Sequence, residues 1–251
     1  MIEANRISKS FEGKLILDDI SAKFHKGKTN LIIGSSGTGK SVFLKNLVGL
    51  VQPDEGEVLY DGRNFTHSDK TTKADIRREI GMLFQGGALF DSKNVEQNIM
   101  FPLDVLTDMP LDEKQDRVNY CLERVGLVDS NKKMPSEISG GMKKRVGIAR
   151  AIVNNSKYLF CDEPNSGLDP QTSIVIDNLI YDITEELDIT TIVVTHDMNS
   201  VMEIGENIVF LYKGKKLWEG NNENIFDCDC KELEDFIFAN KLMRAVKKNR
   251  G

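Results

Sequence analysis

An eight-residue segment combines glycines, a lysine and hydroxyl groups in a spacing that suits phosphate binding. It matches the P-loop pattern G-x-x-x-x-G-K-[ST], which ends here in Lys40 and Ser41. The apolar run 30–33 precedes it and the run 42–48, of helical composition, follows it, so we expect a strand, a glycine-rich turn and a helix N terminus. Backbone N–H groups and the helix dipole would attract phosphate oxygens, Lys40 would reach the β- and γ-phosphates, and the Ser41 hydroxyl would hold Mg²⁺. The alternative, an ordinary flexible loop, is disfavoured because both the spacing and the strand–helix context are met. The residues expected to hold the nucleotide are Gly34, Ser35, Ser36, Gly37, Thr38, Gly39, Lys40, Ser41 and Val42.

Three further runs that read as strands are followed by side chains that could complete such a site. Gln85 follows the run 79–84, where its amide could bind Mg²⁺ or water, or simply begin a loop. Asp162 and Glu163 follow the run 158–161, and we expect Asp162 to hold Mg²⁺ and Glu163 to orient or deprotonate the attacking water. His196 follows the run 190–194 and could hydrogen-bond a γ-phosphate, although a single histidine is usually structural. Because ligands collect at the carboxyl ends of strands in open α/β sheets, we expect these residues at one sheet edge, with Lys40 completing the catalytic set.

A second glycine-rich segment opens a basic helix. Ser139 is placed to be an N-cap, and the backbone N–H groups of Gly140, Gly141 and Met142 would then make a second anion site. The alternative is a capped helix with a flexible entry. One chain would thus carry two helix N termini that suit phosphate.

Composition and charge bound the class of protein. The 251 residues are enough for one large domain or slightly more, and 40% hydrophobic with 29% charged residues is ordinary for a globular protein. A net charge of −6 argues against general nucleic-acid binding, although local basic patches are compatible with it. The four cysteines include one C-x-C pair and no second pair, so we expect thiols in a reducing cytosol rather than a zinc site. The sequence shows neither a membrane-span pattern nor a signal-peptide pattern, so a membrane partner would be another chain.

The remaining elements would position these residues. We expect short strands over 1–24 with a loop at 12–14, and a hairpin turn at Asp61-Gly62, which together predict an antiparallel β region beside an α/β core. Phe11 lies in that region, either as a core or turn aromatic or as a surface for stacking a base. Beginning at Gly86, the chain reads as a helical insertion, with a helix predicted over 112–122.

Taken together, these motifs resemble the nucleotide-binding subunit of an ATP-binding cassette (ABC) transporter. They stand in family order over about residues 2–221: the Walker A segment, Gln85 as the Q-loop, the signature 139–143, the Walker B end Asp162-Glu163, the D-loop 166–169 and the switch residue His196. The resemblance implies an ATPase that uses ATP and Mg²⁺. It implies an α/β fold, a P-loop NTPase (RecA-like) core with an antiparallel β subdomain and an inserted helical subdomain. It also places Phe11 against the adenine. The departures are Met142 in place of the usual Gln, Ile138 in place of Leu, and Asn165 in place of Thr.

The signature form and the run 84–92 resemble one branch, the ATPases of Mla-type (MCE-associated) lipid transporters. This resemblance implies phospholipid transport through a separate permease, together with an MCE-type lipid-binding protein. It implies a head-to-tail homodimer at the cytoplasmic face of a bacterial inner membrane, in which each P-loop faces the partner's Ser139, Gly140 and Gly141. No nucleic-acid partner is implied. Apolar residues near Gln85 are candidates for permease docking or for insertion core: Ala88, Leu89, Phe90, Met100 and Phe101.

The domain organisation expected is a nucleotide-binding domain over 1–225, with its helical insertion at about 86–150, and a C-terminal helical tail over 226–251. The tail carries apolar residues from Leu233 to Val246 and a basic end at 247–250. It could pack on its own chain, or contact the second cassette or anionic lipid headgroups.

Three rival functions share some of these features. A small GTPase would need an Asn-Lys-x-Asp motif, and the nearest candidate, 240–243, lacks the aspartate. A cassette ATPase acting on nucleic acid or ribosomes would carry a long coiled coil or two cassettes. An ABC importer or exporter for a small solute is the runner-up.

Overall fold

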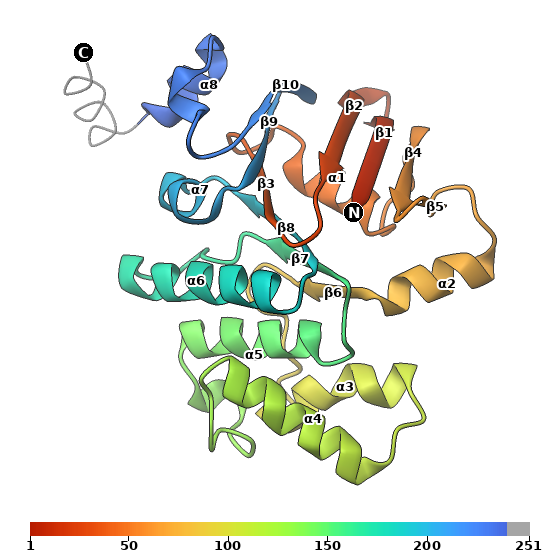
Figure 1. Cartoon of the computed structure of the whole chain (residues 1–251), viewed down its shortest axis with the longest axis vertical. Coiled ribbons are helices and arrows are strands. Elements are labelled where there is room, and N and C mark those ends of the chain that lie inside the picture. Colours follow the sequence, from red (N-terminus) through yellow and green to blue (C-terminus); the bar gives the residue numbers. More distant parts are fainter. Residues whose placement is uncertain (240–251) are drawn as a thin grey trace. The chain divides into compact units, whose positions relative to one another are not determined.

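The computed structural model describes residues 1–239, which divide into two compact units (Figure 1). The first unit contains residues 1–25 and 30–67 and the described part of 194–251, and the second contains 26–29 and 68–193. Residues 240–251 lie outside the described part, and with them the predicted basic end of the tail and the 240–243 segment.

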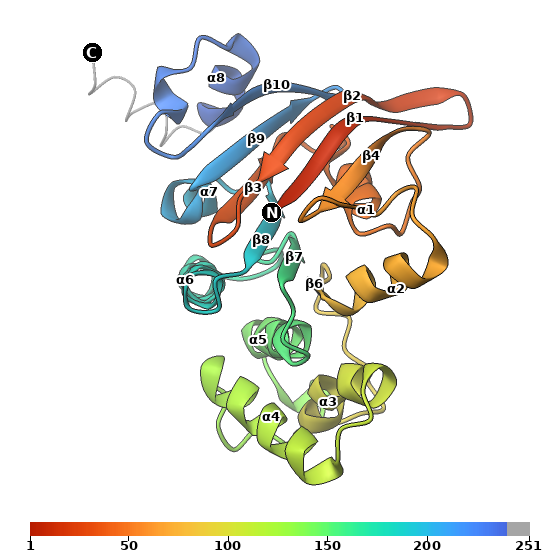
Figure 2. The same ribbon diagram turned by 45° about the vertical axis from the view of Figure 1, so that its right-hand side comes forward.

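An antiparallel sheet forms one part of the first unit, in the strand order β2-β1-β4-β5. Figure 2 shows β2, β1 and β4 side by side. The predicted loop at 12–14 is a two-residue turn at Glu12-Gly13, because Lys14 already belongs to β2, and the predicted turn at Asp61-Gly62 is confirmed. Positive φ at all four turn residues is typical of the tight hairpin turn that matches strand twist. The prediction of short strands was wrong. Register shifts along β1 break the alternating pattern by which a long strand is recognised, without ending the strand. The bounds are β1 (Ile2–Phe11), β2 (Lys14–Phe24), β4 (Glu55–Tyr60) and β5 (Arg63–Asn64).

A second group of strands in this unit has the order β10-β9-β3, with β3 and β9 parallel and β9 and β10 antiparallel. Every residue of β3 is buried, the polar Thr29 and Asn30 as well as the apolar run 31–33, and Thr29 belongs to the second unit. Helix α1 follows the P-loop and buries Phe43, Leu44 and Leu47, at the spacing of one helix face. The bounds are β3 (Thr29–Ile33), α1 (Lys40–Leu47), α7 (Met198–Ile204), β9 (Asn207–Tyr212), β10 (Lys215–Gly220), the 3₁₀ helix η2 (Ile225–Asp227) and α8 (Lys231–Ile237).

The described part of the tail packs on its own chain. Leu233 and Ile237 of α8 are buried, and the rings of Phe236 and Phe210 of β9 lie 5.6 Å apart. Of the two alternatives for the tail, these residues therefore support packing on the first unit. The proposed domain boundary at residue 225 stays a prediction.

The second unit contains strands in the order β8-β7-β6, and β6 and β7 are parallel. Between β6 and β7 the regular structure of residues 86–150 is helical, as predicted. The expected helix over 112–122 is α4, which buries Val118, Cys121 and Leu122. Burial raises the pKa of the Cys121 thiol to about 11, so this thiol is protonated at neutral pH. The bounds are α2 (Lys70–Arg78), β6 (Ile80–Leu83), α3 (Val95–Leu106), α4 (Leu111–Arg124), η1 (Pro135–Glu137), α5 (Gly140–Ile152), β7 (Tyr158–Asp162), α6 (Pro170–Glu186) and β8 (Thr190–Thr195), whose last two residues belong to the first unit.

Helix α5 is central to the second unit, because it contacts β6, α3, α4 and α6 (Figure 1). It approaches β6 closely at Gly147, where a Cβ atom would lie 2.6 Å from Cδ1 of Leu83. Val146, Ile148 and Ala149 are buried around this contact. The position of α5 against the strand is therefore fixed by packing.

The described helices include none with both the length and the hydropathy of a membrane span.

Candidate functional site

The P-loop of the first unit is folded around the side chain of Lys40. The Lys40 ammonium is buried and donates to the carbonyl oxygens of Gly34 at 2.8 Å and Ser35 at 3.0 Å. The Thr38 hydroxyl also donates to the Ser35 carbonyl, at 2.9 Å. These hydrogen bonds hold the two ends of the loop together, with the Lys40 side chain between them.

The N terminus of α1 has no side-chain cap, since its N-cap residue is Gly39. By contrast, Ser139 caps α5 and Asp169 caps α6 through side-chain oxygens. The amide groups in the first turn of α1 therefore remain available to phosphate oxygens, with the helix dipole behind them. This arrangement fits the phosphates of a nucleotide.

The glycine at the start of the loop is required by a close backbone contact. Gly34 has φ +148°, and a Cβ atom there would lie 2.3 Å from the carbonyl oxygen of Leu211. Gly37 has φ +80°, but a Cβ atom there would meet nothing within 4 Å. A residue with a side chain would therefore be strained in its backbone at both positions, but it would clash with a neighbouring atom only at position 34.

Alanine substitutions at these two glycines should separate strain from clash. Gly37→Ala should lower the free energy of unfolding by about 1 kcal/mol, because only a left-handed backbone must be accommodated. Gly34→Ala should cost about 3 kcal/mol, because the β9 backbone must also move. Urea unfolding monitored by circular dichroism measures both values. Equal losses for the two variants would contradict the close contact.

Two other predicted nucleotide-binding residues lie in the first unit. Phe11 ends β1 with 44% of its surface exposed, and the Lys9 ammonium lies 5.4 Å from its ring centroid. Phe11 is therefore not a core aromatic, and its ring presents a face that a base could stack on. His196 directly follows β8 and is exposed, and Asp197 next to it caps α7.

The second unit brings Gln85, Asp162 and Glu163 to one sheet edge. Strands β6 and β7 run parallel, with Leu83 opposite Cys161. Asp162 comes one residue after this pair and Gln85 two residues after it, so both leave the sheet at its carboxyl end. The expectation of a shared edge is confirmed for these strands, and the roles of the side chains stay predictions.

The predicted metal ligands suit magnesium by their chemistry. Ser41, Gln85 and Asp162 supply a hydroxyl, an amide and a carboxylate oxygen, the hard donors that Mg²⁺ prefers. Residues 1–239 contain no cluster of three His, Cys, Asp or Glu side chains that could hold a metal ion. Mg²⁺ usually takes one or two protein ligands together with substrate phosphates and water.

Glu163 stands in an unusual backbone conformation. Its φ is +48°, in the left-handed region that a non-glycine residue seldom adopts. Its carbonyl oxygen accepts from the backbone N–H of Ser166 at 3.2 Å and from the Lys144 ammonium at 3.3 Å. The turn that carries the predicted base is thus held by a side chain of α5.

The signature segment forms the N terminus of α5, as predicted. The Ser139 hydroxyl oxygen accepts from the backbone N–H of Met142 at 3.2 Å. A Cβ atom on Gly141 would lie 2.5 Å from Cγ2 of Thr172, so α5 and α6 meet closely at this point. The N-cap reading is confirmed, and the anion-binding role of Ser139, Gly140 and Gly141 stays a prediction.

Reasoning from the sequence missed two cations of α5, Lys144 and Arg150. Lys144 is 3% exposed, and burial lowers the pKa of its ammonium, while Cys161, Glu163 and Asp162 partly oppose this effect. Burial likewise lowers the pKa of the Arg150 guanidinium. A detectable indication existed, because Lys144 falls between buried Gly141 and Ile148 at helical spacing.

Comparisons with known proteins identify the family. The family model described as ABC transporter matches residues 17–166, more than half of the chain. The Mycobacterium bovis protein named "Probable ribonucleotide transport ATP-binding protein mkl" is 38% identical over 241 residues, covering 96% of this chain and 67% of that protein. The methionine import ATP-binding protein MetN of Carboxydothermus hydrogenoformans is 40% identical over 229 residues, covering 90% and 68%.

Solved structures agree. The dimeric bacterial ABC transporter cassette MJ0796 superimposes with a TM-score of 0.80 and 32% identity, covering 88% of this chain and 99% of that chain. Another structure of MJ0796 is a post-hydrolysis state bound to ADP and Pi. The cbiO1 protein of Clostridium perfringens, part of the transporter complex cbiONQ, gives a TM-score of 0.84 with 29% identity and covers 98% of both chains. The predicted fold class, an α/β P-loop NTPase, is thereby confirmed. The chain belongs to the ABC transporter family, as an ATPase subunit that uses ATP and Mg²⁺.

Proposed function

We propose that the chain powers phospholipid transport through a separate membrane permease, working as a head-to-tail homodimer at the cytoplasmic face of a bacterial inner membrane. In each composite site, ATP lies on Gly37–Ser41 of one copy, and Ser139 and Gly141 of the other copy face its γ-phosphate. Lys40 and His196 would neutralise charge on the transferred phosphoryl group, Mg²⁺ when bound would supply further positive charge there, and Glu163 would position the water. The dimeric cassette structures of MJ0796 support the two-copy arrangement.

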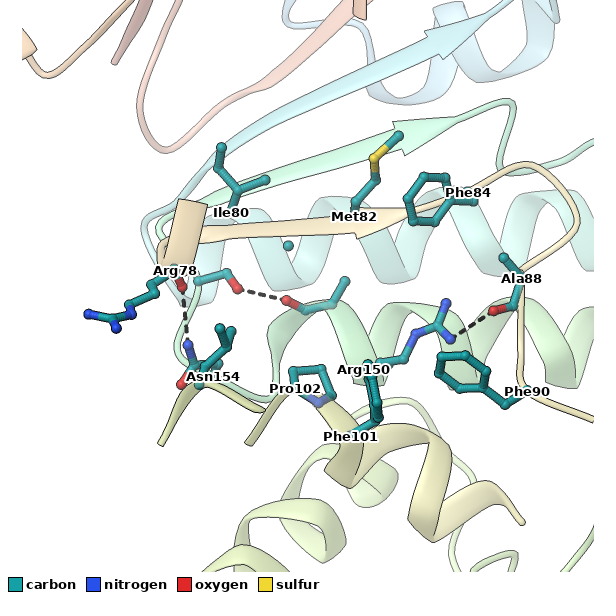
Figure 3. Close-up of a pocket in the computed structure, with 14 residues that line it drawn as sticks. Arg78, Ile80, Met82, Phe84, Ala88, Phe90, Phe101, Pro102, Arg150 and Asn154 are labelled. Atoms are coloured by element: carbon teal, nitrogen blue, oxygen red, sulfur yellow. Dashed lines mark hydrogen bonds between the residues drawn. The ribbon is translucent and has the colours of Figure 1, made fainter. Parts of the chain in front are cut away.

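The observation that carries the permease proposal is an apolar pocket in the second unit (Figure 3). Its volume is about 270 Å³, below the roughly 300–1,000 Å³ typical of small-molecule sites, so it suits side chains of an inserted protein segment. Phe84 and Phe90 are each about two-fifths exposed beside it. The pocket is lined mainly by apolar residues, among them Phe84, Ala88, Phe90, Phe101, Pro102 and Leu106.

Three of the five predicted docking residues line this pocket, and their position supports the proposal. Ala88, Phe90 and Phe101 line it, and the rings of Phe90 and Phe101 meet edge to face with centroids 4.8 Å apart. Met100 is 7% exposed and does not line the pocket, so it belongs to the core of the helical segment. Leu89 is half-buried and also lies outside the lining.

Two side chains hold the segment after Gln85 in place at this pocket. The Asn98 amide is fully buried; its oxygen accepts from the Phe90 N–H at 2.8 Å, and its nitrogen donates to the carbonyls of Phe90, Lys93 and Asn94. The Arg150 guanidinium donates to the carbonyl of Ala88 at 2.9 Å (Figure 3) and to that of Gly87 at 2.8 Å. A partner seated on the pocket would therefore push on backbone that continues directly into Gln85.

A charge at the pocket should release the permease. Phe90→Asp should reduce co-purification of the permease from membranes by at least ~10-fold, because a carboxylate would be buried against the apolar partner. The fold should survive, since Asn98 holds the backbone of residue 90 rather than its ring. Val105→Asp, on α3, is the matched control, since Val105 is 64% exposed and lies outside the lining. Equal retention of the permease by both variants would exclude the pocket as the docking site.

The cargo separates the main proposal from its runner-up. The resemblance of residues 84–92 and of the signature to Mla-type ATPases favours phospholipid and an MCE-type partner, whereas the name of MetN favours import of a small solute. Purifying the chain with its membrane partners, and identifying bound lipids and proteins by mass spectrometry, tests this choice. Recovery of an MCE-type protein and phospholipid is the expected result, and recovery of a solute-binding protein would favour the importer. A cassette acting on nucleic acid is disfavoured by the net charge of −6.

A further inference from the structure

The strongest unassigned feature is the buried ammonium of Lys144. This side chain lies on the face of α5 that packs into the second unit, where a charged group is rarely fully buried unless it has partners. The Lys144 ammonium donates to a backbone oxygen, the carbonyl of Glu163, at 3.3 Å. A lysine used only to fill this space could be replaced by an apolar residue without the cost of burying a charge.

The position of the contact is specific. The Glu163 carbonyl also closes the turn to Ser166, and Glu163 itself has the left-handed φ of +48°. Such a backbone conformation costs free energy and persists only where surrounding contacts impose it. Lys144 supplies one of those contacts from a helix whose own place is fixed against β6 at Gly147.

We infer that Lys144 is a positioning residue for ATP hydrolysis. It holds the backbone of Glu163 so that the Glu163 carboxylate points toward the attacking water. This inference rests on the proposed role of Glu163 as the base. Because Lys144 directly follows the signature segment 139–143 on α5, it also links the helix proposed to face the partner's nucleotide to the turn proposed to serve this chain's own nucleotide. A shift of α5 would thus move the backbone of Glu163 through its hydrogen bond with Lys144.

The test compares two cations of α5 that contact backbone carbonyls. Lys144→Met should lower kcat between ~10-fold and ~100-fold with KM for ATP unchanged, as expected when a reacting group is misplaced by about an ångström. Lys144→Arg keeps the charge and the donors and should restore most of the activity. The control is Arg145→Met, since Arg145 donates instead to the carbonyls of Val125 and Gly126. This control should lose comparable thermal stability but keep kcat within about twofold.

A double variant distinguishes failure of this inference from failure of the base assignment. In a Glu163→Gln background, Lys144→Met should lower the single-turnover rate no further, because residues that act through one another are not additive. An equal fold-loss in both backgrounds would overturn the positioning role while leaving Glu163 as the base. Near wild-type hydrolysis by Glu163→Gln alone would instead remove the base assignment. An equal kcat loss in Arg145→Met would reduce Lys144 to a structural residue.

Discussion

Replacing Glu163 with glutamine should lower ATP hydrolysis by at least ~100-fold, because the amide cannot accept a proton from the attacking water. ATP binding should persist, since the P-loop, with Lys40 and the uncapped N terminus of α1, is untouched. If two copies close around ATP and open only after hydrolysis, the variant should accumulate as an ATP-bound dimer. Phosphate release measures the first effect, and light scattering coupled to size-exclusion chromatography measures the second.

A matched glutamate controls for the loss of charge in the same unit. Glu137→Gln removes a carboxylate that accepts from the Met134 N–H at the start of η1 and that directly follows neither β6 nor β7 in the chain. This variant should hydrolyse ATP at the wild-type rate. Hydrolysis at that rate in Glu163→Gln would show that another group activates the water.

The P-loop and the signature N-cap could be predicted because their determinants are local. Lys40 bonds to the loop that precedes it, and Ser139 caps the helix that follows it, so both act within a few residues of their motifs. The contact between Gly34 and the Leu211 carbonyl is the one long-range exception among these. Periodicity likewise placed the buried face of α4. Short stretches of neighbouring residues determine these features, so they can be predicted from a single sequence.

Long-range contacts explain what was missed. Lys144 bonds to a carbonyl 19 residues away, and Arg150 to carbonyls 62 and 63 residues away, and any residue could supply those carbonyls. Because every residue has a backbone carbonyl, the amino-acid type at the acceptor position does not reveal the bond. Lys144 and Arg150 therefore resembled part of an exposed basic helix surface. The length of β1 was missed for a related reason, because its register shifts are defined only by the partner strands β2 and β4.

The proposed composite site predicts a large loss of turnover when Ser139 is replaced by a bulky residue. Ser139→Arg should lower ATP turnover at least ~100-fold, because a long charged side chain would stand where the partner's γ-phosphate must approach the α5 N terminus. The dissociation constant for ATP should change less than about threefold, since each P-loop binds its nucleotide within its own chain. Fluorescent-nucleotide titration of the isolated chain and a steady-state phosphate assay measure the two quantities separately.

The cap must be separated from the interface, because the Ser139 hydroxyl oxygen also accepts from the Met142 N–H. Ser139→Ala loses the same cap, at a cost of about 1 kcal/mol in unfolding free energy, but adds no bulk. Turnover in Ser139→Ala should therefore stand well above that in Ser139→Arg at equal thermal stability. Loss of ATP binding in Ser139→Arg would mean that the signature serves the chain's own nucleotide, and the head-to-tail arrangement would be wrong. Mixing Ser139→Arg with a Lys40→Ala chain sharpens the result, since a head-to-tail pair of the two variants contains one site free of both substitutions and should regain part of the activity.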